Sequence, residues 1–396
     1  DGAITVSATF ELPSELSTSE PSPPAAHTPA APQRRTLWYR VPEQYGDALT
    51  PNCDPFAIAT LLLAMRHSAD LVVHGPVSPS LITNLEEFQA AWSCWRPNHY
   101  HRIAIHADSE QESPTAASGD RVISAFSGGV DSCYTALRHR RGLCGRLQRN
   151  LQAGMMVHGF DIPLKQTDAF AKAIVGSRVM LSSLGMDLIP VATNFRQVIK
   201  LDWEDAFGTA IASCLTLFSN HYRAGLIPGS YSYHALGFPY GSNPISDRLM
   251  SSQGFEIVHD GVDATRADKI RCLSSWDEAL HHLRVCWEGE DKYRNCGRCE
   301  KCIRNILNFR IVGIDAPPCF SHAVTNAEIR AMRVKNAQLD ALTALWQSAK
   351  TANISDPWVG ALEHAIRRNR QRAQLESYIP PALKQQLKQL PFLSKR

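Results

Sequence analysis

The chain has 396 residues, which is long enough for two or three domains. Hydrophobic residues make up 44% of it and charged residues 20%, the proportions of a soluble globular protein, and the net charge is only +3. No stretch approaches the roughly 20 uncharged apolar residues of a membrane span, so we expect no association with a membrane. Eleven cysteines without an N-terminal signal pattern indicate a reducing compartment, and we therefore expect a cytoplasmic protein.

The first hundred or so residues carry strand and helix patterns but no chemical motif. Ile4–Phe10 and Thr36–Val41 are predicted to be strands that pair with each other. The Pro-, Ser- and Ala-rich stretch Pro13–Arg35 between them is predicted to be a disordered loop. Asp54 and Pro55 are suited to the N-cap and first position of a helix.

That helix is expected to continue to Arg66, and three further elements follow it. They are a strand at Asp70–His74, a helix at Ser80–Trp95 and a strand at Arg102–His106. Together these patterns predict a small α+β domain over residues 1–108, joined by a polar linker at Asp108–Asp120 to the rest of the chain.

From Arg121 onward strands and helices alternate, which predicts an α/β domain with a parallel sheet over residues 121–320. The expected strands are Val122–Phe126, Gly154–Asp161, Met186–Ala192, Leu226–Ser230 and Glu256–His259, and the expected helices are Cys133–Arg141, Ala169–Leu184 and Trp203–Arg223. Ligands bind such sheets at the carboxyl ends of the strands. The segments expected around one cleft are 127–132, 158–161, 193–196 and 229–233.

The most informative segment is Ser127–Ser132, with the sequence Ser-Gly-Gly-Val-Asp-Ser between an expected strand and an expected helix. Backbone N–H groups and the positive end of the helix dipole converge at such a turn, which makes an anion site. Gly128 and Gly129 let the backbone approach the anion, and Ser127 and Ser132 can add hydroxyl donors. No Gly-Lys-Ser/Thr follows, so the loop is not a Walker loop. The alternative interpretation is an ordinary Gly-Gly turn.

A second motif consists of four cysteines with the spacing Cys-x9-Cys-x-x-Cys-x-x-Cys, namely Cys286, Cys296, Cys299 and Cys302. Four thiolates can close a tetrahedral zinc site. Gly297 lies in the first Cys-x-x-Cys step, where tight knuckles tolerate positive φ, and Arg298, Lys301 and Arg304 can offset the charge of the centre. An iron–sulfur cluster and redox-active thiols are the alternatives.

Two further segments have no clear assignment. Ser230–Pro244 is aromatic and Gly-rich, and its rings are predicted either to stack a flat heterocycle or to form a packed loop. Residues 321–396 are expected to be helical and basic, because eight Lys or Arg residues after Pro357 are opposed only by two Glu. The eight are Arg367, Arg368, Arg370, Arg372, Lys384, Lys388, Lys395 and Arg396. They indicate either a solvated face or a surface for nucleic acid or an acidic protein.

The Ser-Gly-Gly-x-Asp-Ser loop resembles the PP-loop of the ATP pyrophosphatase superfamily, whose domains have the adenine-nucleotide α-hydrolase-like fold. With the four cysteines about 150 residues further on, residues 121–310 resemble the 7-cyano-7-deazaguanine synthase family. The resemblance omits the N-terminal region and the C-terminal helices, and relatives use a different sequence at Ser230–Pro244. Members of this wider group accompany some bacterial antiphage systems, which makes antiviral defence a possible context.

The resemblance implies roles for individual residues. It implies that pyrophosphate is bound by Ser127, Gly128, Gly129, Asp131 and Ser132. It also implies that the four cysteines bind zinc, and that His158, Gly159 and Phe160 border the adenine and ribose. Thr265–Ile270 is similar to an element that precedes the zinc segment in related enzymes. Within it Arg266 or Lys269 is expected either to bind phosphate or a substrate carboxylate, or to be a surface cation.

The implied reaction is an attack by a carboxylate on the α-phosphorus of ATP with Mg²⁺, followed by transfer of the acyl group to nitrogen. Asp131 is the first candidate to orient Mg²⁺ or the loop, with Asp161 and Asp247 behind it, and His158 and His234 are candidates for proton transfer. The expected substrate is a small carboxylate, with a deazapurine as candidate, and both a homodimer and a protein partner are considered. The alternatives are a tRNA-modifying PP-loop enzyme, which is not favoured, and a partner-dependent component that conjugates a group to another protein.

Overall fold

The computed structural model describes residues 2–12, 33–112, 119–286 and 288–377. Most of the predicted Pro13–Arg35 loop, part of the linker before Asp120, and the basic residues Lys384, Lys388, Lys395 and Arg396 lie outside the described residues. No helix of the described part of the chain is both long and apolar enough to cross a membrane.

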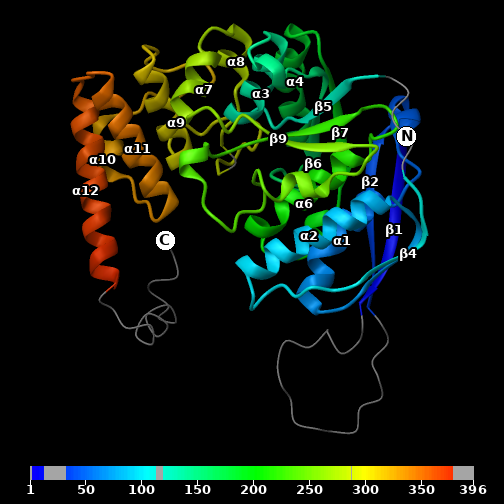
Figure 1. Ribbon diagram of the computed structural model, residues 1–396. Coiled ribbons are helices and arrows are strands. Elements are labelled where there is room, and N and C mark those ends of the chain that lie inside the picture. The colour runs from blue at the N-terminus through cyan, green and yellow to red at the C-terminus, as the bar shows by residue number, and fades with distance from the viewer. Residues whose placement is uncertain (1, 13–32, 113–118, 287, 378–396) are drawn as a thin grey trace.

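A seven-stranded sheet with the order β1-β2-β7-β6-β5-β8-β9 forms the centre of the molecule (Figure 1). Its strands are β1 Ala3–Leu12, β2 Gln33–Pro42, β5 Arg121–Ala125, β6 Asn150–His158, β7 Asp187–Thr193, β8 Ala224–Pro228 and β9 Glu256–Asp260. The five strands from β5 onward pair in parallel, so the α/β prediction is confirmed. Short apolar strands such as β5 suit this position, because Val122 packs on one face and Ile123 on the other.

Helices cover both faces of the sheet (Figure 1). One face carries α3 Val130–Arg140 and α4 Thr167–Ser183, and its core continues through α7 Arg266–Leu273, α8 Asp277–His282 and α9 Glu300–Ile311. The other face carries α1 Asp54–His67, α2 Pro79–Trp95 and α6 Trp203–Thr216. Short helical elements between these are η2 Glu43–Ala48, η3 Gly145–Leu147, α5 Phe195–Val198, η4 Tyr233–Ala235 and η5 Asp247–Met250.

The N-terminal hairpin is attached directly to the main sheet. β1 and β2 pair antiparallel from Ala3↔Pro42 to Leu12↔Gln33, which confirms the predicted pairing. β2 then pairs antiparallel with β7 through Tyr39 and Arg40. Leu37 and Tyr39 of β2 and the buried residues of α1 share one core with α6. The division of the chain near residue 108 stays a prediction, while the hydrophobic core runs across it without interruption.

Several predicted boundaries are wrong. β2 starts at Gln33 inside the predicted loop, because its pairing with β1 continues to that residue. β3 Leu71–Val77 and β4 Ile105–Glu110 form a separate parallel pair, so β4 extends into the predicted linker. α6 ends at Thr216 and β8 starts at Ala224, where it pairs with Val122. Cys53 rather than Asp54 precedes α1, and the buried Asp54 carboxylate instead accepts hydrogen bonds from Ser78.

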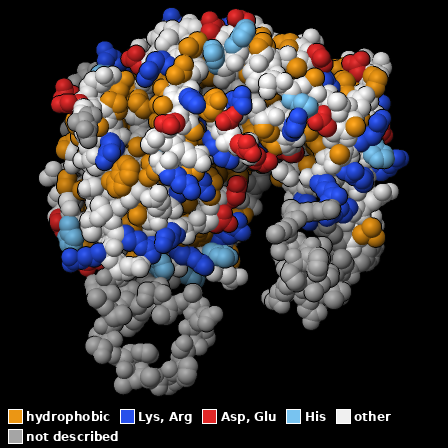
Figure 2. All heavy atoms as spheres, turned by 180° about the vertical axis from the view of Figure 1, so that it is seen from behind, with side chains coloured by type: hydrophobic (Ala, Val, Ile, Leu, Met, Phe, Trp, Pro, Cys, Tyr) orange, Lys and Arg blue, Asp and Glu red, His pale blue; other side chains and the backbone are white. Residues whose placement is uncertain are grey.

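The C-terminal described region consists of α10 Asn326–Ala331, α11 Ala337–Thr351 and α12 Pro357–Ser377, which extend the core of α9. Arg367, Arg368, Arg370 and Arg372 of α12 are exposed. From behind, blue Lys and Arg side chains lie on the C-terminal side of the molecule, which is continuous with its body in the upper part of the view (Figure 2).

Candidate functional site

The Ser127–Ser132 loop connects the carboxyl end of β5 to the first turn of α3. Gly128 has φ +74°, a conformation that disfavours any side chain, and Gly129 is the N-cap residue of α3. Ser127 Oγ accepts the Gly129 N–H at 3.3 Å, and Ser132 Oγ donates to the Gly129 carbonyl at 3.1 Å. No side chain caps α3, so the N–H groups of its first turn are left for another acceptor. This is the geometry of an anion site.

The loop lies at the point where the strand order reverses. β6 follows β5 in the chain and pairs on one side of it, whereas β8 pairs on the other side. In open α/β sheets the ligand crevice opens at such a point, outside the carboxyl ends of the two central strands. Here those ends are the loop after β5 and Gly229 after β8, and we name the region between them the crevice.

Three charged residues bridge this crevice. Lys269 Nζ of α7 donates to Asp131 Oδ1 at 2.8 Å and to the Gly229 carbonyl at 2.5 Å, and Arg266 Nη2 donates to Asp131 Oδ2 at 3.0 Å. The Lys269 side chain is only 2% exposed, so it is not a surface cation. Burial acts to raise the pKa of Asp131, but the charges of Arg266 and Lys269 outweigh it and hold that pKa below its usual value. Asp131 is therefore an anion whose two oxygens both accept from cations.

Arg284 is a further cation at the loop that the sequence did not reveal. Its backbone N–H donates to the Gly128 carbonyl at 2.8 Å, and its Nη2 donates to the Ser127 carbonyl at 3.2 Å. Its Nε is buried and has no hydrogen-bond partner among the described residues. Burial lowers the pKa of Arg284, against the opposing charge of Asp161. The only available signal was its position two residues before Cys286.

The first turns of α9 carry Lys301, on which the charges of Asp161 and Arg266 act. Burial lowers the pKa of Lys301, and the charge of Asp161 acts in the opposite direction. Arg304 Nε contacts Glu300 Oε1 at 2.6 Å. Asp161 thus acts electrostatically on both Arg284 and Lys301, next to the loop.

His158 and Gly159, at the end of β6, are packed closely against their neighbours. The His158 ring stacks on Phe170 with centroids 4.4 Å apart, and its Nε2 contacts the Pro163 carbonyl at 3.0 Å, so the ring is used in packing. Burial lowers the pKa of His158. Gly159 has φ +107°, and a Cβ there would lie 2.0 Å from the Thr193 carbonyl oxygen. Only glycine therefore fits between the ends of β6 and β7.

Phe160 begins a continuous chain of aromatic rings. Phe160 contacts Trp203 at 5.2 Å between centroids, Trp203 contacts Phe207 at 6.3 Å, Phe207 contacts Tyr240 at 5.0 Å, and Tyr240 contacts Tyr231 at 5.2 Å. Burial raises the pKa of Tyr231, with Arg304, Arg266 and Asp131 as smaller influences. Within the predicted aromatic segment, Tyr231 and Tyr240 thus pack on each other next to the charged crevice, whereas Tyr233 and Phe238 are 63% and 43% exposed.

The four cysteines lie together. Their sulfur atoms are within 4.8 Å of one another, with Cys286–Cys296, Cys286–Cys299 and Cys296–Cys302 distances of 3.5, 3.6 and 3.8 Å. A tetrahedron of Zn–S bonds of about 2.3 Å places its sulfurs ~3.8 Å apart. Backbone N–H groups of Glu288 and Cys299 donate to two of the sulfurs, each at 3.3 Å. This cluster could bind a metal ion such as zinc.

Gly297 has φ +74°, and a Cβ there would lie 2.5 Å from the His322 Cβ. The predicted tight knuckle is therefore present, and only glycine fits it. A hydrogen bond with Cys302, opposed by burial, lowers the pKa of Cys299.

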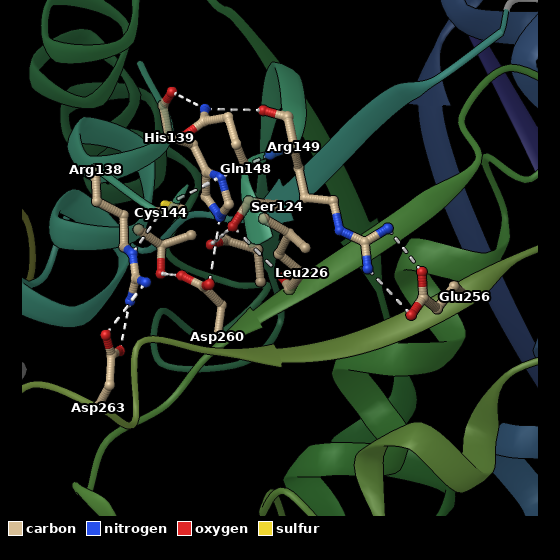
Figure 3. Close-up of polar contacts among 12 residues, drawn as sticks. Ser124, Arg138, His139, Cys144, Gln148, Arg149, Leu226, Glu256, Asp260 and Asp263 are labelled. Carbon is tan, nitrogen blue, oxygen red and sulfur yellow. Dashed lines mark hydrogen bonds and ion pairs between the residues drawn. The ribbon is translucent and has the colours of Figure 1, made fainter. Parts of the chain in front are cut away.

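A buried polar network fixes the second half of α3 to the end of β9 (Figure 3). His139 Nε2 contacts Asp260 Oδ1 at 3.3 Å, and Thr135 Oγ1 donates to Asp260 Oδ2 at 2.7 Å. Arg138 donates to both carboxylate oxygens of Asp263 at 2.6 and 3.3 Å. Burial acts to raise the pKa of Asp260, but His139, Thr135 and Arg138 together hold it below its usual value. The Asp260 carbonyl also accepts the Gly229 N–H, so this network reaches the crevice.

The structure thus gathers Ser127, Gly128, Gly129, Asp131, Ser132, Arg266 and Lys269 in one place, with the cysteines joined to it through Arg284. Asp247 makes no contact with the loop among the described contacts, and both oxygens of its carboxylate are engaged by Ser242, Asn243 and His259. Nor does the structure bury His234, whose Nε2 contacts Ser232 Oγ at 3.5 Å. Comparisons of the chain with models of protein families, with curated proteins and with solved structures gave no match.

Proposed function

We propose that the chain is an ATP-dependent adenylating enzyme of the PP-loop type, which activates a carboxylate with release of pyrophosphate and transfers the acyl group to nitrogen. The observation that carries this proposal is the uncapped amino-terminal end of α3 facing Lys269, Arg266 and Arg284 across the crevice. Such a concentration of donors and positive charge suits the polyphosphate of a nucleotide.

In this account ATP binds with its pyrophosphate portion on the Ser127–Ser132 loop. A carboxylate oxygen attacks the α-phosphorus, the bond from that phosphorus to the bridging oxygen breaks, and pyrophosphate leaves. The negative charge that builds up on pyrophosphate is stabilised by the first-turn N–H groups of α3, the Ser127 and Ser132 hydroxyls and the nearby cations. Mg²⁺, when bound, would neutralise part of the same charge.

Asp131 acts in this account as a positioning residue. Its two oxygens hold Lys269 and Arg266 at 2.8 and 3.0 Å, which leaves it poorly placed to bind Mg²⁺ as well. Asp161 is a further candidate carboxylate for Mg²⁺, and its charge acts on both Arg284 and Lys301 beside the loop.

The buried Arg284 Nε is an observation that favours an anion at the loop. A polar atom buried without a partner is costly, and an anion on the loop would satisfy it. Gly128 supports the same assignment, since a Cβ there would lie 3.1 Å from Ser177 Oγ and its φ is +74°.

The substrate is proposed to be a flat carboxylate such as that of a deazapurine. The aromatic chain from Phe160 to Tyr231 offers ring faces beside the charged crevice, where a heterocycle would stack. The identity of the acyl group rests on the resemblance of residues 121–310 to 7-cyano-7-deazaguanine synthase. The four cysteines are proposed to hold Zn²⁺, which would fix the segment that carries Arg284.

The test is pyrophosphate and AMP release from ATP and Mg²⁺, with 7-carboxy-7-deazaguanine and ammonium as substrates. We expect Lys269→Met and Ser132→Ala to lower the rate about 100-fold or more, because each removes a donor to the leaving group. Arg271→Ala is the matched control for Lys269. Arg271 lies on the same helix, but its side chain is 60% exposed and pairs with Asp268.

Loop-dependent release of AMP and pyrophosphate that requires the carboxylate would support the proposal. Release of ADP and phosphate would contradict it, because those products require attack at the γ-phosphorus. Equal losses in Lys269→Met and Arg271→Ala would also contradict it, since the effect would then not depend on the crevice.

A further inference from the structure

A second polar cluster lies beside Gly229, whose carbonyl accepts from Lys269. Asp247 of η5 is fully buried and His259 of β9 has a side chain only 5% exposed. His259 Nδ1 lies 2.7 Å from Asp247 Oδ2, and Ser242 Oγ donates to the same oxygen at 2.6 Å. The Asn243 backbone N–H donates to Asp247 Oδ1 at 3.1 Å. The carboxylate is therefore held in place by three donors.

This arrangement fixes which nitrogen of His259 carries the proton. Asp247 accepts from Nδ1, so the neutral ring bears its hydrogen on Nδ1 and its lone pair on Nε2. His259 Nε2 has no hydrogen-bond partner among the described residues, and it is not completely shielded from solvent. Nε2 is thus an acceptor that no described group uses, on a side chain that is only 5% exposed.

His259 Nε2 lies against Gly229, at the edge of the crevice. A Cβ built on Gly229 would come within 2.7 Å of this nitrogen, so the absence of a side chain at Gly229 is what makes room for the ring. The Gly229 carbonyl accepts from Lys269 Nζ, which in turn binds Asp131. One backbone residue therefore separates the imidazole from the cations at the loop.

The other histidines near the crevice are less suited to accept a proton. His158 uses its Nε2 at the Pro163 carbonyl and stacks its ring on Phe170. His234 is exposed and has no carboxylate to orient it among the described contacts. A carboxylate that fixes Nδ1 and leaves Nε2 unused is the arrangement of an oriented general base.

We propose that His259 is the general base for the acyl-transfer half of the reaction, with Asp247 as its positioning residue. The inference rests on the proposed function. The nucleophilic nitrogen of ammonia or a primary amine forms a bond to the acyl carbon, and the bond from that carbon to the AMP oxygen breaks. AMP leaves with the electron pair. The proton that the nitrogen loses passes to His259 Nε2 and then to solvent.

The experiment separates the two half-reactions in His259→Asn and His259→Gln. The Asn amide can replace Nδ1 as a donor to Asp247 but has no counterpart of Nε2, whereas the Gln amide reaches toward Nε2 without being basic. The first half-reaction is followed by carboxylate-dependent exchange of pyrophosphate into ATP. The second is followed by amide formation from ammonium. His281→Asn, at an exposed residue of α8, is the control.

We expect both His259 variants to keep wild-type exchange and to lose amide formation by about 100-fold or more, the usual contribution of a general base. Hydroxylamine traps an acyl adenylate with little need for a base, so it should restore product formation in both variants. Asp247→Asn should lower amide formation, because it turns the ring toward the wrong tautomer.

Wild-type amide formation in His259→Asn would overturn the inference. Parallel loss of exchange and amide formation would also overturn it, since His259 would then support the fold of the crevice rather than the transfer step. If the wild-type chain gives no exchange at all, the proposed function itself fails and the inference falls with it. That outcome can be told apart from a failure of the inference, because it is seen in the wild-type chain and does not involve the His259 variants.

Discussion

At the scale of single residues, the crevice depends on charges that are buried together. Lys269 is buried against Asp131 and the Gly229 carbonyl, so its charge has little water to stabilise it. Removing one partner of such a pair leaves the other charge buried without compensation. This costs more free energy of folding than the intact pair contributes. The loop geometry and a buried cation therefore depend on one carboxylate.

We expect Asp131→Asn to destabilise the fold by about 3 kcal/mol at pH 7, because it leaves Lys269 unpaired. The pKa of Asp131 is lowered in the folded chain, so its contribution is present above the ordinary aspartate pKa of about 4 and is lost as pH falls through the folded value. The difference between wild type and variant should shrink in acid.

Urea denaturation at pH 7 and below pH 4 measures this difference. Asp108→Asn is the control, because the pair of Asp108 with His74 is exposed on both sides. Its expected effect is within about 0.5 kcal/mol. A stability gap for Asp131→Asn that stayed constant in acid would show that the carboxylate charge is not what holds Lys269.

At the scale of elements, the N-terminal hairpin supports the strands that carry the site. Asn194, just after β7, accepts from the Trp38 N–H at 3.0 Å and donates to the Thr36 carbonyl at 2.8 Å. Tyr39 of β2 donates to Ser213 Oγ of α6 at 2.9 Å in the core, and burial raises the pKa of Tyr39 well above its usual value. β7 and α6 are thus fixed to the hairpin by buried hydrogen bonds.

Tyr39→Phe should lower the free energy of unfolding by about 1 kcal/mol, because it removes one buried hydrogen bond and keeps the ring. The expected pyrophosphate release at 25 °C is unchanged, since Tyr39 does not touch the crevice. Tyr233→Phe is the matched control, because Tyr233 is 63% exposed. Equal stability changes in the two variants would mean that the Tyr39–Ser213 bond contributes nothing.

The loop and the cysteines could be predicted because each is encoded by neighbours in the sequence. Six consecutive residues define the loop, and the cysteine spacing by itself defines the cluster. Arg284 and His259 could not be predicted in the same way. Arg284 reaches Ser127 across 157 positions, and the orientation of His259 depends on Asp247 and Gly229. Such contacts follow from strand order and packing, which no local pattern reveals.

Strand ends were predicted less well for a related reason. The extra residues Gln33–Arg35 of β2 have a polar sequence, yet they pair with Phe10–Leu12 because the hairpin register continues. The attachment of β2 to β7 rests on only two residue pairs and the Asn194 side chain. A pairing this short leaves no recognisable periodicity in the sequence.

At the scale of the whole molecule, the crevice is closed by parts of the chain that lie far apart in sequence. α7 supplies Lys269, the segment before the cysteines supplies Arg284, and the end of β8 supplies Gly229. The cysteine cluster connects the Arg284 segment to α9, whose core continues through α10, α11 and α12 (Figure 1). Metal at the cluster would therefore couple the C-terminal helices to the loop.

Cys299→Ser should reduce bound zinc from one atom per chain, measured by elemental analysis, and lower the thermal midpoint of the protein. Chelation of the wild type should have the same effect, because a structural metal contributes folding free energy. Cys94→Ser is the control, since Cys94 is an exposed cysteine outside the cluster. Iron in place of zinc, or unaltered stability after complete removal of metal, would contradict this assignment.

The most direct test of the central claim follows one oxygen atom. 7-Carboxy-7-deazaguanine labelled with ¹⁸O in its carboxylate is incubated with the protein, ATP, Mg²⁺ and ammonium, and AMP is analysed by mass spectrometry. Attack of the carboxylate on the α-phosphorus predicts that one ¹⁸O atom is carried into AMP when the acyl group departs. Label found in inorganic phosphate, or AMP formed without label, would contradict carboxylate adenylation at the Ser127–Ser132 loop.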